Sequence, residues 1–340
     1  MQPPTRRRHP LLTVAVVGAI TCGLLVIGLV APAASLDNHA ARAKKSHHAA
    51  KRTATTTTGA AAVVGTLPAA PYAVGVTHVT YFDATRGRTI AVTIRYPVMG
   101  TAGGDEVADE IADVGNYPLV VFAHGYAVSA DTYAALEHEI AEAGFVVAAP
   151  DFPYTSSAVT DAPDEDDVSN QATDVSFVIS ELLDASTVPD VLSGAIAGTP
   201  VGVVGHSDGG VTAAAVAYNS SVADPRVGAA VILSGAEARY DGTWFTTQSP
   251  PLLAIHGTAD EINPLGSSEQ LYADATGPKM LVTVDGGSHL GPFTTDPVEP
   301  VIGTLVGDFL DAHLRNDAAA AQRLPGDADV AGALTLAAST

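Results

Sequence analysis

The segment Pro200–Tyr218 reads PVGVVGHSDGGVTAAAVAY, and it decides the predicted fold. A short run rich in valine is followed by the motif Gly205-His-Ser207-Asp-Gly209, and small residues typical of a closely packed helix come after the motif. A buried strand, a tight turn and a helix in this order place the serine at a strained corner with its hydroxyl exposed. The free N–H groups at the start of the helix point toward the same place. We therefore predict that Ser207 is a nucleophile rather than a serine in an ordinary glycine-rich turn.

Strand-like segments occur on both sides of this motif. The first two are amphipathic, whereas the later ones are nearly continuous runs of Val, Ile, Leu and Ala, as in parallel strands that are covered on both faces. The predicted strands are Val74–Phe82, Thr89–Tyr96, Leu119–Ala123, Phe145–Ala149, Val201–Val204, Ala229–Leu233, Leu252–Ile255 and Met280–Val284.

Segments with helical periodicity alternate with these strands, around residues 133–140, 172–182 and 298–309. Such alternation predicts an α/β fold with a mostly parallel central sheet of about eight strands and helices on both faces. The length fits one domain with one core. Only eighteen residues separate Leu233 from Leu252, which is too few for a large helical lid, so we expect an open cleft.

A serine hydroxyl needs a base that removes its proton and an acid that orients the base. Asp260 lies in the loop after one predicted strand, and His289 lies in a glycine-rich turn after the next. The carboxyl ends of parallel strands meet at one edge of a sheet, where ligands bind, so both loops should reach Ser207. We predict a triad of Ser207, Asp260 and His289, with Asp285 and Glu261 as weaker rivals for the acid.

Catalysis through such a serine also requires two backbone N–H groups that stabilise the negative oxygen of the intermediate. We predict that they belong to Asp208, directly after the nucleophile, and to Tyr126, in the loop after an early strand. Gly125 would let that loop curl toward the site. The Asp208 carboxylate should point away from this oxyanion hole. Tyr126, Trp244 and Phe245 are candidate walls for the substrate.

The remaining polar motifs are given structural interpretations. We interpret His206 and His256, which flank the motifs, as packing or turn residues rather than bases. The acidic run Asp161–Asp167 lacks the spaced ligands and the turn glycine of an EF-hand loop, so a solvated loop or a helix N-terminus is preferred to a Ca²⁺ site. No metal site and no cofactor are predicted.

Several motifs along the chain also resemble those of a known family. From about Tyr81 to Leu324 the chain resembles the α/β-hydrolase family, in the branch that contains cutinase-like polyester hydrolases, chlorophyllases, platelet-activating-factor acetylhydrolase-like esterases and dienelactone-hydrolase-like proteins. The motifs that carry the resemblance are Phe122–Tyr126, Ala143–Val147, the Gly205–Gly210 elbow, Gly257–Pro264 and Asp285–Phe293.

The resemblance implies hydrolysis of carboxylic esters through an acyl-enzyme, with Ser207, Asp260 and His289 at the triad positions. It implies a serine esterase similar to cutinases and polyester hydrolases, or to lipases and other esterases. The chain departs from the cutinase pattern at Asp208, where those enzymes usually carry methionine, and it lacks their C-terminal disulfide.

Two alternatives stay open on the sequence alone. One is another acyl hydrolase on the same fold, such as a platelet-activating-factor acetylhydrolase-like enzyme, a thioesterase or a peptidase. The other is an exported, non-catalytic binding protein with a vestigial triad. For the preferred interpretation we expect a monomer, with a small-molecule or polymeric ester as its substrate.

Composition divides the chain into an N-terminal targeting segment and a body. A basic cluster followed by the apolar run Leu11–Ala34 is the pattern of a secretory signal, or of a membrane anchor if it is not cleaved. We therefore predict a signal or anchor over 1–35, a flexible basic and Thr-rich linker over 36–65, a hydrolase domain over 66–325 and a C-terminal tail over 326–340. The body would be secreted or extracytoplasmic and would meet a membrane only through an uncleaved N-terminal segment.

Charge and cysteine content exclude further classes. The sequence has 16 basic and 37 acidic residues, and its first 60 residues hold eight of the basic residues and one acid, so the body is strongly acidic. An acidic body repels phosphate backbones, which excludes nucleic acid as a partner. The single cysteine, Cys22, lies in the apolar run, so the body has neither a disulfide nor a thiol nucleophile.

Overall fold

The computed structural model describes residues 70–159, 162–246 and 249–339. The predicted signal or anchor over 1–35 and the linker over 36–65 lie outside the described residues. Among the helices of the described part, none has the length and apolarity needed to cross a membrane.

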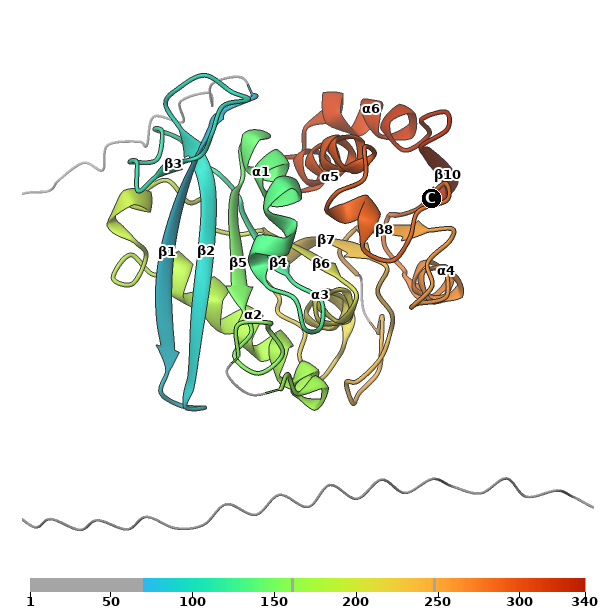
Figure 1. Ribbon diagram of the computed structural model, residues 1–340, viewed down its shortest axis with the longest axis horizontal. Coiled ribbons are helices and arrows are strands. Elements are labelled where there is room, and N and C mark those ends of the chain that lie inside the picture. Colours follow the sequence, from blue (N-terminus) through green and yellow to red (C-terminus); the bar gives the residue numbers. More distant parts are fainter. Residues whose placement is uncertain (1–69, 160–161, 247–248, 340) are drawn as a thin grey trace, which may run out of the picture. The chain divides into compact units, whose positions relative to one another are not determined.

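The described residues form one ten-stranded sheet with the order β10-β9-β8-β7-β6-β4-β5-β2-β1-β3 (Figure 1). Its centre, from β5 to β9, is parallel, whereas β1, β2 and β10 add antiparallel pairs at the two sides. The α/β fold predicted from the sequence is confirmed, and all eight predicted strands are present. The strands are β1 Ala73–Asp83, β2 Arg88–Val98, β3 Val107–Ala108, β4 Leu119–Ala123, β5 Val146–Asp151, β6 Val201–His206, β7 Val227–Leu233, β8 Leu252–Gly257, β9 Lys279–Val284 and β10 Leu334–Ser339.

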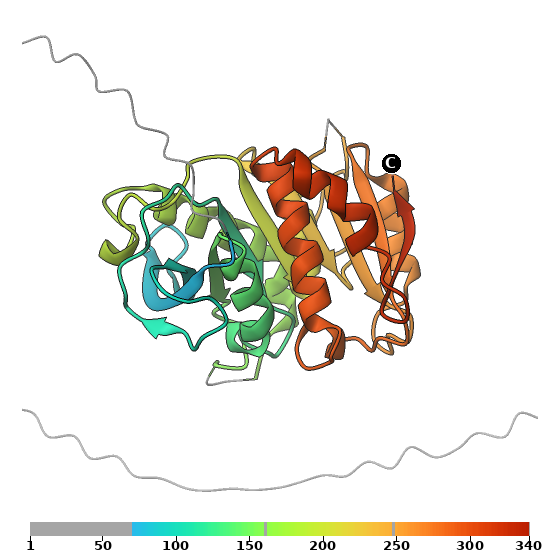
Figure 2. The ribbon, with the colours of Figure 1, turned by 90° about the horizontal axis from the view of Figure 1, so that it is seen from above.

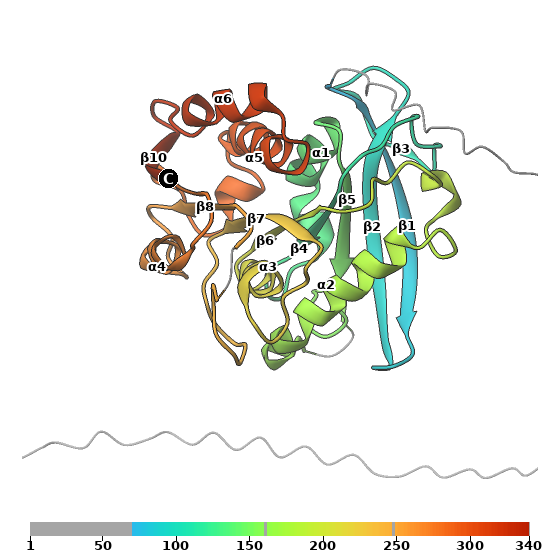
Figure 3. The ribbon, with the colours of Figure 1, turned by 180° about the vertical axis from the view of Figure 1, so that it is seen from behind.

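Helices cover both faces of this sheet. One apolar core joins α2, α3 and α4 to one face, and a second core joins α1, α5 and α6 to the other. Figures 1 and 3 show these two layers from opposite sides, and Figure 2 shows α1 and α5 side by side over one face. The helices are α1 Ala134–Glu142, α2 Val168–Leu183, α3 Asp208–Tyr218, α4 Gly266–Asp274, α5 Glu299–Leu314 and α6 Ala318–Asp327.

The C-terminal segment differs from the predicted tail over 326–340. Asp317 caps α6 by accepting hydrogen bonds from the Ala319 and Ala320 amides, and the chain then returns as β10 beside β9. The sheet and the helices packed on it therefore continue beyond residue 325. The sequence gives little sign of β10 because an edge strand needs few buried side chains, and here only Leu334 is fully buried.

A buried carboxyl group between α1 and α5 makes the fold sensitive to pH. Glu299 is 6% exposed, and its burial, together with the nearby Glu139, raises its pKa to about 7 against a weaker lowering by His138. A raised carboxyl pKa means that the ionised form is penalised in the folded state. The penalty is absent below about pH 4.5, grows as the pH rises, and is complete above pH 7.

We expect Glu299→Gln to stabilise the protein at pH 8 on the order of 2 kcal/mol, because glutamine resembles the protonated acid. The midpoint of thermal unfolding should rise by several degrees at pH 8 and by little at pH 4.5. Glu269→Gln, at an exposed position on α4, is the matched control and should change neither midpoint. An equal shift of the Glu299→Gln midpoint at both pH values would contradict this account.

Candidate active site

The turn between β6 and α3 is a sharp elbow that carries Ser207. The serine has φ 57° and ψ −121°, a conformation that non-glycine residues rarely adopt. The glycines on either side make the turn possible. A Cβ on Gly205 would lie 2.1 Å from the Gly209 carbonyl oxygen, and a Cβ on Gly209 would lie 2.0 Å from the Ala123 carbonyl oxygen. Strand β4, strand β6 and helix α3 therefore meet in backbone contact directly beneath the serine.

The structure brings the three predicted side chains together. The Ser207 Oγ lies 2.9 Å from the His289 Nε2, and the His289 Nδ1 lies 2.8 Å from the Asp260 Oδ2. Asp260 comes from the loop after β8 and His289 from the loop after β9. Strands β6 to β9 are neighbours and parallel, so these loops leave the same edge of the sheet.

The surroundings of Asp260 keep it ionised. Its side chain is 1% exposed, and its Oδ1 accepts hydrogen bonds from the amides of Ile262 and Asn263 at 2.9 and 2.8 Å. Burial alone would raise the pKa of this carboxyl, but the hydrogen bonds from His289, Asn263 and Ile262 outweigh it and lower the pKa. An ionised Asp260 accepts a hydrogen bond from the His289 Nδ1–H, which keeps the proton on Nδ1 and leaves the Nε2 free to accept the Ser207 proton.

The rival acids occupy other places. The Asp285 carboxylate accepts a hydrogen bond from the Thr335 hydroxyl of β10 at 3.2 Å, on an exposed part of the sheet edge. Glu261 lies closer, but its carboxylate accepts from the backbone amide of His289 at 3.3 Å rather than from the ring. Of these three carboxylates, all within the described part of the chain, Asp260 alone has a hydrogen bond to the imidazole.

The loop after β4 lies against the elbow. A Cβ placed on Gly125, the residue before Tyr126, would be 3.3 Å from the Ser207 Cβ, so this loop packs against Ser207. The carbonyl oxygen of Gly125 accepts a hydrogen bond from the His124 ring at 2.7 Å, and His124 in turn accepts from the Phe152 amide. The Gly125 carbonyl and the Tyr126 N–H belong to one planar peptide unit. The hydrogen bond to the Gly125 oxygen therefore also fixes the direction of the Tyr126 N–H. The Asp208 N–H is the first of α3 and has no partner within the helix.

The Asp208 side chain is held by a basic residue that sequence reasoning did not single out. Its Oδ1 lies 3.7 Å from the Nε of Arg239, and Arg239 also pairs with Glu165 across the site. Burial raises the pKa of Asp208 and Glu165 adds to the increase, whereas Arg239 opposes it. The guanidinium thus lies beside the carboxylate that follows the nucleophile and offsets its negative charge.

This pairing predicts a charge-compensation experiment. Asp208→Ala should keep kcat for a neutral ester within about threefold of wild type, because the variant retains the backbone amide. Arg239→Ala should lower kcat about tenfold, since it leaves an uncompensated carboxylate beside the developing oxyanion. The double variant should recover to the level of Asp208→Ala. A large loss in Asp208→Ala alone would show that this carboxylate is not turned away from the oxyanion hole.

Two of the three predicted substrate walls are not near the nucleophile. Trp244 forms an isolated bridge with Asn219, and Phe245 packs on Tyr218 with the ring centroids 4.6 Å apart. Tyr218 ends α3, about 15 Å from its first turn at a rise of about 1.5 Å per residue. The prediction for Trp244 and Phe245 is therefore wrong, because the part of the β7–β8 connection that carries them packs at the C-terminal end of α3. Tyr126 is 38% exposed, and Ile262, two residues after Asp260, is 65% exposed.

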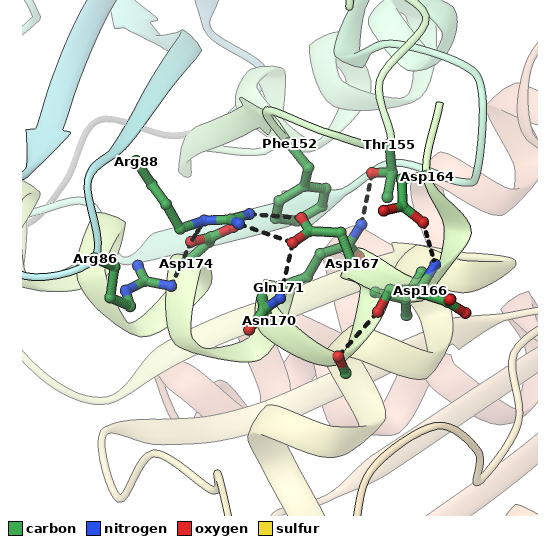
Figure 4. Close-up of polar contacts among 12 residues, drawn as sticks. Arg86, Arg88, Phe152, Thr155, Asp164, Asp166, Asp167, Asn170, Gln171 and Asp174 are labelled. Carbon is green, nitrogen blue, oxygen red and sulfur yellow. Dashed lines mark hydrogen bonds and ion pairs between the residues drawn. The ribbon is translucent and has the colours of Figure 1, made fainter. Parts of the chain in front are cut away.

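The loop before α2 forms the side of the site that faces Tyr126. The Tyr126 hydroxyl donates a hydrogen bond to the Pro163 carbonyl oxygen at 2.8 Å. A buried ion-pair cluster anchors the end of this loop (Figure 4): Arg88 of β2 binds Asp167 at 2.7 Å and contacts Asp174 as well. The acidic run was expected to be a solvated loop or a helix N-terminus, and Asp167 lies at the N-terminus of α2, where it is buried rather than solvated. Removing one partner from such a cluster typically costs about 3–5 kcal/mol.

Comparisons with known proteins bear on the family and the fold. Residues 107–252 match the family model described as chlorophyllase. The structure resembles that of a ferulic acid esterase from Streptomyces cinnamoneus, with a TM-score of 0.59 and 23% sequence identity over 74% of this chain and 93% of that one. The fold is that of an α/β-hydrolase. The structural likeness shows the fold, and the family model, which covers less than half of the chain, indicates the carboxylic ester hydrolases as the class that this chain resembles.

Curated relatives match this chain over short stretches only. The uncharacterized protein YfhR of Escherichia coli K12 is 42% identical over 57 residues, which are 16% of this chain and 20% of that protein. Its counterpart from Salmonella typhi is 43% identical over 44 residues, or 13% and 15% of the two chains. The matched segment thus spans about a fifth or less of each relative's length.

Proposed function

We propose that this hydrolase is an exported serine esterase that cleaves carboxylic esters through an acyl-enzyme. The observation that carries the proposal is the continuous hydrogen-bonded series from Ser207 through His289 to Asp260, at 2.9 and 2.8 Å. A serine, a neutral histidine and a buried carboxylate at these distances are what an activated nucleophile requires.

In the acylation half of the reaction, the His289 Nε2 removes the Ser207 proton as the Oγ attacks the ester carbonyl carbon. The carbonyl oxygen becomes negative and accepts hydrogen bonds from the amides of Tyr126 and Asp208. Asp260 stabilises the positive imidazolium. The proton then passes from the Nε2 to the alcohol oxygen as the carbon–oxygen bond breaks, and the acyl group remains on Ser207.

Deacylation repeats these steps with water. The His289 Nε2 takes a proton from the water, whose oxygen attacks the acyl carbon. The same amides stabilise the second tetrahedral intermediate. Collapse of the intermediate returns the proton to the Ser207 Oγ and releases the carboxylic acid. Each half therefore begins and ends with a neutral imidazole.

Features of the site's rim favour neutral, partly apolar esters. Tyr126 and Ile262 present exposed apolar surface on the loops that carry the oxyanion amide and the acid. Among the described residues of the β7–β8 connection there is no helix that could act as a lid. Asp208, Glu165 and Glu261 surround the site and disfavour an anionic substrate. A cutinase-like preference for polyesters would be one form of this preference for neutral, partly apolar esters.

The test measures hydrolysis of p-nitrophenyl esters of increasing acyl length by the body of the protein, together with a polyester film. A fluorophosphonate probe should label one peptide, the one that contains Ser207. Matched thioester and amide substrates separate an esterase from a thioesterase or a peptidase. If the folded protein neither hydrolyses any ester nor reacts with the probe, the site is vestigial and the proposal is wrong.

Export is tested separately with the full chain. We expect the body to reach the outside of a bacterial host, because the basic and apolar N-terminal pattern directs secretion. The N-terminal sequence of the exported protein distinguishes a cleaved signal from a retained anchor. Accumulation of the intact chain in the cytosol would contradict export while leaving the esterase assignment intact.

A further inference from the structure

His206, the residue immediately before the nucleophile, is buried and makes contacts that the reaction does not use. It is 2% exposed, and its ring lies 4.6 Å from the ring of His289, centroid to centroid. Its Nε2 lies 2.8 Å from the backbone carbonyl oxygen of His289. On its other side, its Nδ1 lies 2.7 Å from the hydroxyl of Tyr133, which is fully buried.

The partners determine the direction of each hydrogen bond. A carbonyl oxygen only accepts hydrogen bonds, so the His206 Nε2 carries the proton and donates a hydrogen bond to the His289 carbonyl oxygen. The Nδ1 of a neutral imidazole then accepts, so the Tyr133 hydroxyl is the donor. That hydroxyl in turn accepts from the Gly125 amide at 3.3 Å. Burial and the nearby His289 lower the pKa of His206 to about 3, which agrees with a neutral ring.

These bonds form one series that joins three loops. It starts at Gly125, in the loop that supplies the Tyr126 amide, passes through Tyr133 and His206, and ends on the main chain of His289. The nucleophile is the next residue after His206. The proposed oxyanion donor, nucleophile and base are thus linked by hydrogen bonds outside the Ser207–His289–Asp260 series.

We propose that His206 and Tyr133 are positioning residues that hold the His289 loop and the oxyanion loop in register with Ser207. The inference rests on the proposed serine esterase function and adds two residues to it. Their effect should appear in kcat rather than in KM, because they set the distance between reacting groups and do not contact the substrate. A displacement of about 1 Å at a site of this kind can cost about 100-fold in rate.

The experiment compares four variants on one neutral p-nitrophenyl ester. Tyr133→Phe removes only the hydroxyl and should lower kcat about tenfold with KM within twofold. Tyr96→Phe is the matched control, since Tyr96 is equally buried and its hydroxyl donates to the Glu110 carbonyl oxygen of a distant loop. It should lose similar thermal stability but keep wild-type kcat.

The second pair isolates the bond to His289. His206→Leu removes the donor and should lower kcat about 30- to 100-fold. His206→Gln keeps an N–H that can reach the same carbonyl oxygen, so it should recover at least tenfold over leucine at unchanged KM. If His206→Leu fails to fold, the kcat values of His206→Gln and Tyr133→Phe test the positioning role in its place.

Three results would overturn the proposal. They are wild-type kcat in folded Tyr133→Phe, a kcat for His206→Gln no higher than that of folded His206→Leu, and equal losses of kcat in Tyr133→Phe and Tyr96→Phe. Failure of the function itself looks different, because wild type would then lack ester hydrolysis or Ser207→Ala would retain it.

Discussion

Replacing Ser207 by alanine should lower kcat by about 10⁴- to 10⁶-fold while leaving the fold intact. Alanine offers no oxygen to attack the ester, so only the oxyanion amides and substrate binding would still accelerate attack by water. Removal of the serine from other triads has effects of this size. The measurement is kcat on a p-nitrophenyl ester together with labelling by the fluorophosphonate, which should disappear.

Ser267→Ala on α4 serves as the control for Ser207→Ala, and both proteins should unfold at nearly the same temperature. A Ser207→Ala protein that keeps more than one hundredth of wild-type kcat, free of contaminating host esterase, would show that another group attacks the ester. Covalent labelling that persists in this variant would point to the same conclusion.

The second large effect is expected for Asp260→Asn, which should lower kcat about 10³- to 10⁴-fold. The structure indicates how the amide would sit. Two backbone N–H groups, from Ile262 and Asn263, point at the Oδ1 position and require an oxygen there. The NH₂ group must then face the His289 Nδ1, which would accept from it. His289 would carry its proton on Nε2 and could no longer accept the proton of Ser207.

Asp285→Asn is the natural comparison for this variant. Its carboxylate bonds to β10 rather than to the imidazole, so kcat should stay within about twofold of wild type. The reverse outcome, with a large loss in Asp285→Asn and little in Asp260→Asn, would assign the acid to the strand end beside His289 and contradict the geometry described above.

The central sheet could be predicted from the sequence because its parallel strands are covered on both faces and form continuous apolar runs. The convergence of Ser207, Asp260 and His289 followed from the same property, since neighbouring parallel strands end at one edge. Strand β10 and the two-residue β3 could not be predicted, because short edge strands carry almost no buried side chains.

The parts of the site that could not be predicted from the sequence are those set by long loops. Arg239 reaches Asp208 and Glu165 from the β7–β8 connection, whose path has no periodic pattern. The same connection carries Trp244 and Phe245 away from the nucleophile, although both are aromatic and follow a strand end. His206 was correctly interpreted as a packing residue rather than a base, but its bond to the His289 carbonyl depends on a loop at a sequence separation of 83.

The position of β6 in the sheet determines how much of the chain must fold before Ser207 meets His289. This strand pairs with β4 on one side and β7 on the other, and the base follows β9, so that Ser207 and His289 are 82 residues apart. A nascent chain that ends shortly after the β6–α3 turn therefore contains Ser207 without its hydrogen-bond partner His289. The proposed ester hydrolysis therefore requires nearly the whole domain to have been synthesised and folded, because the Ser207–His289 contact joins the loops after β6 and β9, which are separated in the sheet by β7 and β8.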